Sequence, residues 1–95
     1  MFERLYDTSE QAQVQFIGYA SDRARYDFGI VYTNAFFGKP IVFCMQTNRS
    51  TLLDYDDLDN LTYLQKAFQL TTAEAEEVSA LMKQFIPTLS IKDQY

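Results

Sequence analysis

Hydrophobic and polar positions alternate most clearly in two runs, 26–33 and 41–46. Both runs have a period of two and are rich in β-branched and aromatic residues, which is typical of β-strands. The segment between them holds Asn34 and Gly38, which tolerate positive φ angles, and Pro40, whose missing N–H costs least at the first residue of a strand. The pattern predicts a hairpin with a long connecting loop.

Weaker alternation flanks this hairpin on both sides. Residues 13–20 predict a strand before it, and the polar segment 21–25 makes the turn between the two. On the other side, residues 47–49 form a tight turn in which Asn48 suits the left-handed region, and 50–55 predict a short fourth strand. Because all connections are short, we expect a four-stranded antiparallel meander in the order 1-2-3-4.

The pattern changes to a spacing of three and four residues after the strands. Residues 57–68 predict an amphipathic helix that Asp56 or Asp57 caps. Thr71 and Glu74 form a capping box at the start of a second helix, which Pro87 stops at or before Ile86.

The expected fold class is therefore α+β, with a four-stranded antiparallel meander sheet followed by two helices packed on one face. Residues 1–87 form a single domain in this interpretation, and 88–95 form a C-terminal tail.

Both faces of the predicted sheet are apolar, whereas a sheet solvated on one side should alternate more cleanly. Four strands about 4.8 Å apart make a sheet roughly 19 Å wide, and two helices of about 10 Å diameter cover only one such face. Phe16, Phe28, Ile30, Tyr32, Phe43 and Met45 are expected against the helices. The open face should then hold Ile17, Tyr19, Val31 and Val42, with Leu52 as a further candidate.

An open apolar face requires a cover, because monomers rarely expose large apolar patches. The N-terminal segment or the C-terminal tail could fold over it, or a second copy could pack there. We expect a homodimer, since closed two-fold dimers are the commonest assembly. Phe36 and Phe37 at the hairpin tip either insert into a partner or fold under the loop as core.

Composition excludes several function classes. The chain has 95 residues, a net charge of −5 and scattered Lys and Arg residues, so no basic surface for nucleic acid is predicted. It contains no His, which excludes Ser-His and Cys-His pairs and imidazole metal ligands. The charged N-terminus is unlike a signal peptide, no stretch is long enough to span a membrane, and a single Cys forms no internal disulfide, so we expect a cytoplasmic protein.

No candidate site points to a particular reaction or cofactor. The acidic segment 54–59 lacks the Gly and the final Glu of a calcium-binding EF-hand loop and is better explained as a charged helix start. Cys44 lies within an apolar strand and has no His to activate it. We therefore expect no catalytic residues, no metal and no cofactor.

Several short motifs resemble those of a known family. They are Leu5-Tyr6-Asp7, the strand ending in Tyr32-Thr33, the turn Phe37-Gly38-Lys39, and Asp56-Asp57-Leu58 before the helix. Over about Leu5 to Phe85, the chain resembles a small cytosolic family of Gram-positive bacteria, domain of unknown function number three thousand and fifty-five. The resemblance implies a compact cytosolic protein and carries over no catalytic residue.

These observations favour a non-enzymatic interaction or regulatory module that forms a homodimer through the second sheet face. One alternative is an acidic protein that mimics nucleic acid and inhibits a DNA-binding enzyme, since residues 54–59 and 74–77 could align their charges. Another is a small enzyme that uses Tyr and carboxylate groups between the helices and the sheet. A mimic would lose its partner as salt rises, because exposed charge pairs are screened.

Overall fold

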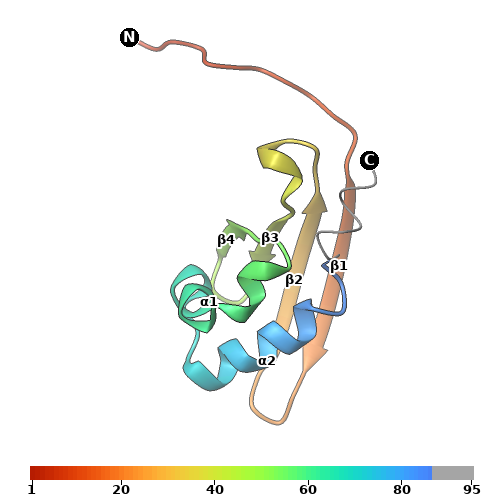
Figure 1. Ribbon diagram of the computed structural model, residues 1–95, viewed down its shortest axis with the longest axis vertical. Helices are drawn as coiled ribbons and strands as arrows, with labels where there is room; N and C mark the ends of the chain where they lie inside the picture. Colours follow the sequence, from red (N-terminus) through yellow and green to blue (C-terminus); the bar gives the residue numbers. More distant parts are fainter. Residues whose placement is uncertain (87–95) are drawn as a thin grey trace.

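The computed structural model describes residues 1–86 and confirms the predicted α+β fold (Figure 1). The sheet is antiparallel in the order β1-β2-β3-β4. Its strands are β1 (Gln13–Ala20), β2 (Arg25–Tyr32), β3 (Ile41–Cys44) and β4 (Arg49–Leu52), and the helices that follow are α1 (Leu61–Phe68) and α2 (Thr72–Met82). Both helices lie on the same face of the sheet (Figure 1). The predicted tail and the predicted stop at Pro87 lie outside the described residues.

The core forms between this face and the helices, and among the strands β2 contributes the most buried apolar side chains. Phe28 is buried at the centre, where its ring lies 6.2 Å from that of Tyr26 and meets Phe68 of α1 edge-on at 5.8 Å. The other buried apolar residues are Ile30, Val42, Cys44, Leu53, Leu58, Leu64, Ala75, Val78, Leu81, Met82 and Ile86. β1 contributes no fully buried residue, because it is an edge strand that pairs with β2 alone.

The first helix begins later than predicted. Residues Asp56–Asp59 form a separate 3₁₀ helix, η2, and Asn60 breaks the helical path with φ −93° and ψ 86°. The cap of α1 is therefore Asn60, whose side chain accepts a hydrogen bond from the Tyr63 N–H at 3.1 Å, and the prediction of Asp56 or Asp57 was wrong. An Asn at this position satisfies an unpaired N–H of the first turn as well as an Asp does, so propensity alone did not separate them.

The second helix begins as predicted. The Thr71 hydroxyl accepts from the Glu74 N–H at 3.2 Å, and the Glu74 carboxylate accepts from the Thr71 N–H at 2.9 Å. Deeper in the helix, the buried Ser79 hydroxyl donates to the Leu58 carbonyl at 2.6 Å. This bond ties α2 to η2, so the two ends of the helical layer are fixed to each other.

The predicted assignment of residues to the two faces was partly wrong. Directly paired residues share a face, and β2 pairs Phe28 with Ile17 on one side and with Cys44 on the other, while Ile30 pairs with Val42. Ile17 and Val42 therefore face the helices rather than solvent. In β1 and in β3, the prediction assigned the alternate residues to the wrong faces of the sheet. Both strands have apolar side chains on both faces, and a shift of one residue moves every side chain to the other face.

The loop between β2 and β3 contains the 3₁₀ helix η1 (Phe36–Gly38). Gly38 adopts a positive φ of 75°, as predicted, but the other positive φ angles in this loop belong to Phe36 and Phe37 rather than to Asn34. Lys39 fixes the loop to η2, since its ammonium group lies 3.6 Å and 3.5 Å from carboxylate oxygens of Asp54 and Asp57. The hairpin tip is thus held with its two Phe side chains exposed.

Candidate functional site

An aligned row of apolar side chains crosses the sheet on the face opposite the helices. Val14 pairs with Val31, Val31 with Ile41, and Ile41 with Leu52, so each strand contributes one residue. Val14 is 48% exposed, and the other three are partly exposed. We call this side of the sheet the open face; its apolar residues are Val14, Phe16, Val31, Ile41, Phe43, Met45 and Leu52.

A second row lies beside the first and contains two aromatic rings. Phe16 pairs with Gly29, Gly29 with Phe43, and Phe43 with Ser50. A Cβ atom on Gly29 would lie 3.3 Å from the Phe16 ring and 3.5 Å from the terminal methyl group of Met45. Because Gly29 has no side chain, these two groups close over the backbone and complete a continuous apolar surface.

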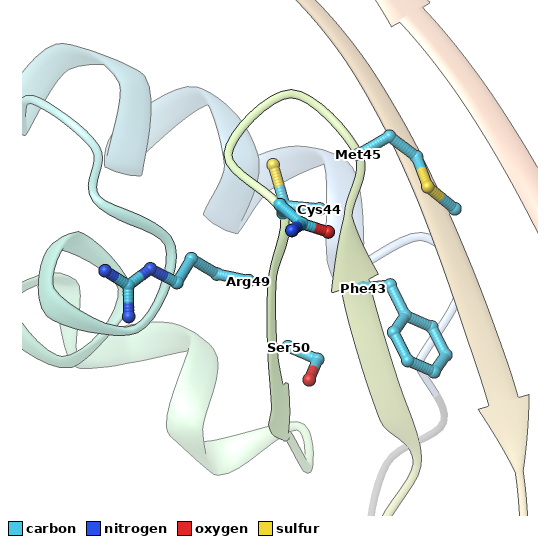
Figure 2. Close-up of a pocket in the computed structure, with 6 residues that line it drawn as sticks. Phe43, Cys44, Met45, Arg49 and Ser50 are labelled. Atoms are coloured by element: carbon cyan, nitrogen blue, oxygen red, sulfur yellow. The ribbon is translucent and has the colours of Figure 1, made fainter.

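The aromatic row remains substantially exposed to solvent. Phe16 is 75% exposed, Met45 51% and Phe43 37%. Figure 2 shows Phe43 and Met45 pointing to one side of the β3–β4 hairpin, while Arg49 points to the other. The hairpin end carries a hollow of about 290 Å³, which Phe43, Cys44, Met45, Asn48, Arg49 and Ser50 line. The polar groups around this hollow are not aligned with one another, so we interpret the hollow as the rim of the open face.

A polar corner limits the open face at the end near the β1–β2 turn. The Gln46 amide donates to Asp27 at 2.7 Å and accepts from the Asp27 N–H at 2.8 Å, while Arg25 donates to the same carboxylate at 3.0 Å. The hydrogen bonds from Arg25 and Gln46 lower the pKa of Asp27, so it is ionised at neutral pH. The open face is therefore apolar toward Val14 and Ile41 and charged toward Arg25.

The structure brings together only part of the surface that the sequence predicted. Val31 lies on the open face, and Phe36 and Phe37 are exposed at the hairpin tip rather than buried as core. Ile17 and Val42 lie on the helix face, where Val42 is completely buried. Tyr19 also lies on the helix side of β1, opposite Tyr26, and is 44% exposed.

Sequence reasoning missed several residues of the open face. Val14 and Ile41 were not assigned to it, and Phe16, Phe43 and Met45 were placed against the helices. One signal could have corrected the error: Gly29 lies between two apolar neighbours and leaves space on one face only, which the Phe16 ring of β1 and the terminal methyl group of Met45 fill.

The acidic segment 54–59 has local structural partners. Asp54 and Asp57 accept each other's backbone N–H groups, both at 3.1 Å, and both approach Lys39. Partial burial lowers the pKa of Lys39, but the carboxylates of Asp57 and Asp54 outweigh it and raise the value overall. Asp59 accepts from Lys83 at 2.6 Å. Within residues 1–86, no three potential metal-ligating side chains gather at one point.

A tyrosine–carboxylate pair connects β2 to α2. The buried Tyr26 hydroxyl donates to Glu77 at 2.7 Å, Ser21 donates to the same oxygen at 3.2 Å, and Arg23 lies 3.6 Å from the other oxygen. Burial and the hydrogen bond to Glu77 raise the pKa of Tyr26, and the same hydrogen bond lowers the pKa of Glu77. The Tyr26 hydroxyl therefore keeps its proton at neutral pH and donates a hydrogen bond to the ionised Glu77, so the pair links β2 to α2.

Cys44 lies in the core, where it is 2% exposed and pairs across the strands with Phe28 and Arg49. Thiol chemistry requires an accessible thiolate. The side chain therefore contributes to packing.

A comparison with protein-family models assigns the chain to a family. The family model described as SAV0927-like matches residues 5–84, so the chain belongs to the SAV0927-like family. No curated protein matches the sequence. Within residues 1–86, neither helix has the length and apolar character needed to cross a membrane.

Proposed function

We propose that this protein is a non-enzymatic interaction module that self-associates through the open face. The observation that carries the proposal is the pair of apolar rows on a sheet face that no described element covers. One row aligns Val14, Val31, Ile41 and Leu52, and the other places the exposed rings of Phe16 and Phe43 on either side of Gly29.

The size of this surface supports a binding role. From the exposed fractions of its side chains, the open face presents about 450 Å² of apolar area. This is within the range of the largest apolar patch on a typical monomer, and such patches are often functional. Its charged corner at Arg25 and Asp27 gives the patch a defined boundary, which is the usual arrangement of an apolar interface core with a polar rim.

The chemistry of the titratable groups supports a role without catalysis. The chain has no His, the buried Tyr26 hydroxyl is bonded to Glu77, and Cys44 is buried. A second copy is the partner that we propose, because a two-fold axis lets each copy cover the open face of the other, and such dimers are the commonest assembly.

Light scattering after size exclusion, over a dilution series, tests the proposal. We expect a mass near twice 11.1 kDa that falls on dilution. Phe16→Asp should raise the dissociation constant by at least about 100-fold, because a side chain that is 75% exposed would bury roughly 150 Å² in the dimer. Gln13→Asp is the matched control, since Gln13 is exposed on the same strand but faces the other side. A wild-type mass of 11.1 kDa at every concentration would contradict the proposal.

We further infer a cytoplasmic location in Gram-positive bacteria. A single buried cysteine without a disulfide suits a reducing compartment. The proposed identity of the SAV0927-like family with domain of unknown function three thousand and fifty-five is checked by the overlap of their member sequences. Fractionation of cells that produce the protein checks the compartment, and recovery in the membrane or the medium would contradict it.

A further inference from the structure

The N-terminal residues 1–12 form an arm that carries apolar side chains away from the domain. The arm has no regular secondary structure, and it continues beyond the end of β1 into solvent (Figure 1). Phe2 is fully exposed, Leu5 is 83% exposed and Tyr6 is 70% exposed. Three large apolar side chains within five positions are costly to leave in water, so the arm needs a surface to cover them.

Glu10 fixes the base of the arm. Its carboxylate accepts hydrogen bonds from the Thr33 hydroxyl and, at 3.2 Å, from the Asn34 N–H at the end of β2. These bonds hold the chain in line with β1 before it enters the sheet. The nine residues before Glu10 therefore point away from their own open face, and a sharp reversal at the anchored segment would be needed to reach it.

The arm is long enough to cross a sheet of this size. Nine extended residues reach about 30 Å, whereas four strands about 4.8 Å apart span roughly 19 Å. The arm can therefore cross all four strands of another molecule and place Phe2, Leu5 and Tyr6 on its apolar rows.

The arm enlarges the apolar interface that the open face provides. A stable interface of standard size buries about 800 Å² on each partner, of which about 450 Å² is apolar, and the open face alone offers about this apolar area. The three apolar side chains of the arm add about 500 Å². Together the two surfaces exceed the standard size, and the same chain supplies both of them in equal number.

We propose that the arm of one copy lies across the open face of a second copy, and that the second copy returns its own arm in the same way. The inference rests on the proposed self-association and specifies its geometry. Both contacts are equivalent under a two-fold axis, so the exchange closes at a dimer and does not propagate into a filament.

Two arm variants test the inference in the full-length chain. Phe2→Asp combined with Leu5→Asp should raise the dissociation constant of the dimer at least tenfold. Thr8→Asp combined with Ser9→Asp is the matched control, because it adds the same charge to the same arm without removing an apolar side chain. All four residues are exposed, so both variants should keep the wild-type unfolding midpoint when they are monomeric.

Paramagnetic broadening in mixed samples gives the position of the arm. A nitroxide attached through Glu3→Cys in one copy should broaden amide signals of 14–16, 29–31 and 41–43 in a ¹⁵N-labelled second copy. Cys44 is buried and should not take up the label. Broadening only when label and isotope are in the same molecule would overturn the inference, since the arm would then cover its own sheet.

The outcomes separate this inference from the proposed function. A dimer that Phe16→Asp disrupts but Phe2→Asp with Leu5→Asp does not would refute the arm exchange and leave the open face as the interface. A dimer without intermolecular broadening would do the same. A wild-type chain that is monomeric at every concentration would overturn both.

Discussion

Because Val31 and Val42 lie on opposite faces of the sheet, we expect replacement by Ala to lower the free energy of unfolding by different amounts at the two positions. Val31 and Val42 lie on the neighbouring strands β2 and β3, but Val42 is fully buried under the helices and Val31 faces the open side. Replacing each by Ala removes the same two methyl groups and changes strand propensity in the same way. The difference between the two losses in unfolding free energy therefore reports burial alone.

The magnitude follows from the environment of each side chain. Val42→Ala loses about 1.6 kcal/mol of transfer free energy and leaves an enclosed cavity that adds about 1 kcal/mol, for a total of about 2.5 kcal/mol. Val31→Ala should cost about 1 kcal/mol, because its side chain is partly solvated and water fills the space that the methyl groups leave.

Urea unfolding of both variants measures the difference at a concentration where the chain is monomeric. A shift in midpoint with an unchanged slope shows that stability, rather than the compactness of either state, has changed. Equal losses for the two variants, or a larger loss for Val31→Ala, would refute the assignment of the faces. At higher concentration, an additional loss for Val31→Ala alone would report the burial of the open face by a second copy.

Two further predictions concern the helices. Thr71→Ala should lower the unfolding free energy by about 1 kcal/mol, since the first turn of α2 loses its capping hydroxyl, whereas Thr62→Ala on the exposed side of α1 should have little effect in the same urea titration. The pKa of Glu77 is lowered in the folded state, chiefly by the hydrogen bond from Tyr26, so its contribution is present above its ordinary value of 4.5 and is lost as the pH falls through the folded value. Glu77→Gln should therefore flatten the decline of stability between pH 5 and pH 3, relative to wild type and to Glu76→Gln; an unchanged decline would contradict the role of the carboxylate.

Local signals predicted the order and type of the elements. Period-two alternation located the first three strands, and the bounds of β1 agree with the predicted segment 13–20. The fourth strand exists as predicted, but β4 begins at Arg49, which was assigned to the turn, and ends at Leu52 rather than at residue 55. Thr71 and Glu74 marked the start of α2, and Asn48 adopts the positive φ expected of it, at 59°. These features depend on residues within a few positions of one another, so the sequence is sufficient to predict them.

The candidate site was less predictable, because it depends on how the strands are aligned. The sequence indicated an excess of apolar side chains beyond what two helices can cover, and this remains the basis of the proposed function. It did not show which residues form that excess. Of the sheet residues predicted for the open face, Val31 and the further candidate Leu52 were placed correctly, and Ile17, Tyr19 and Val42 were not.

The sequence by itself thus determined four antiparallel strands, two helices, the capping box of the second helix, and an excess of apolar side chains on the sheet. Only the tertiary structure decided on which face that excess lies. Alternation along one strand defines two sides but does not connect them to the sides of the next strand, and β1 and β3 are apolar on both. The pairing of Gly29 with Phe16 and Phe43 fixes the register, and the Phe16 ring and the terminal methyl group of Met45 fit over the position that has no side chain.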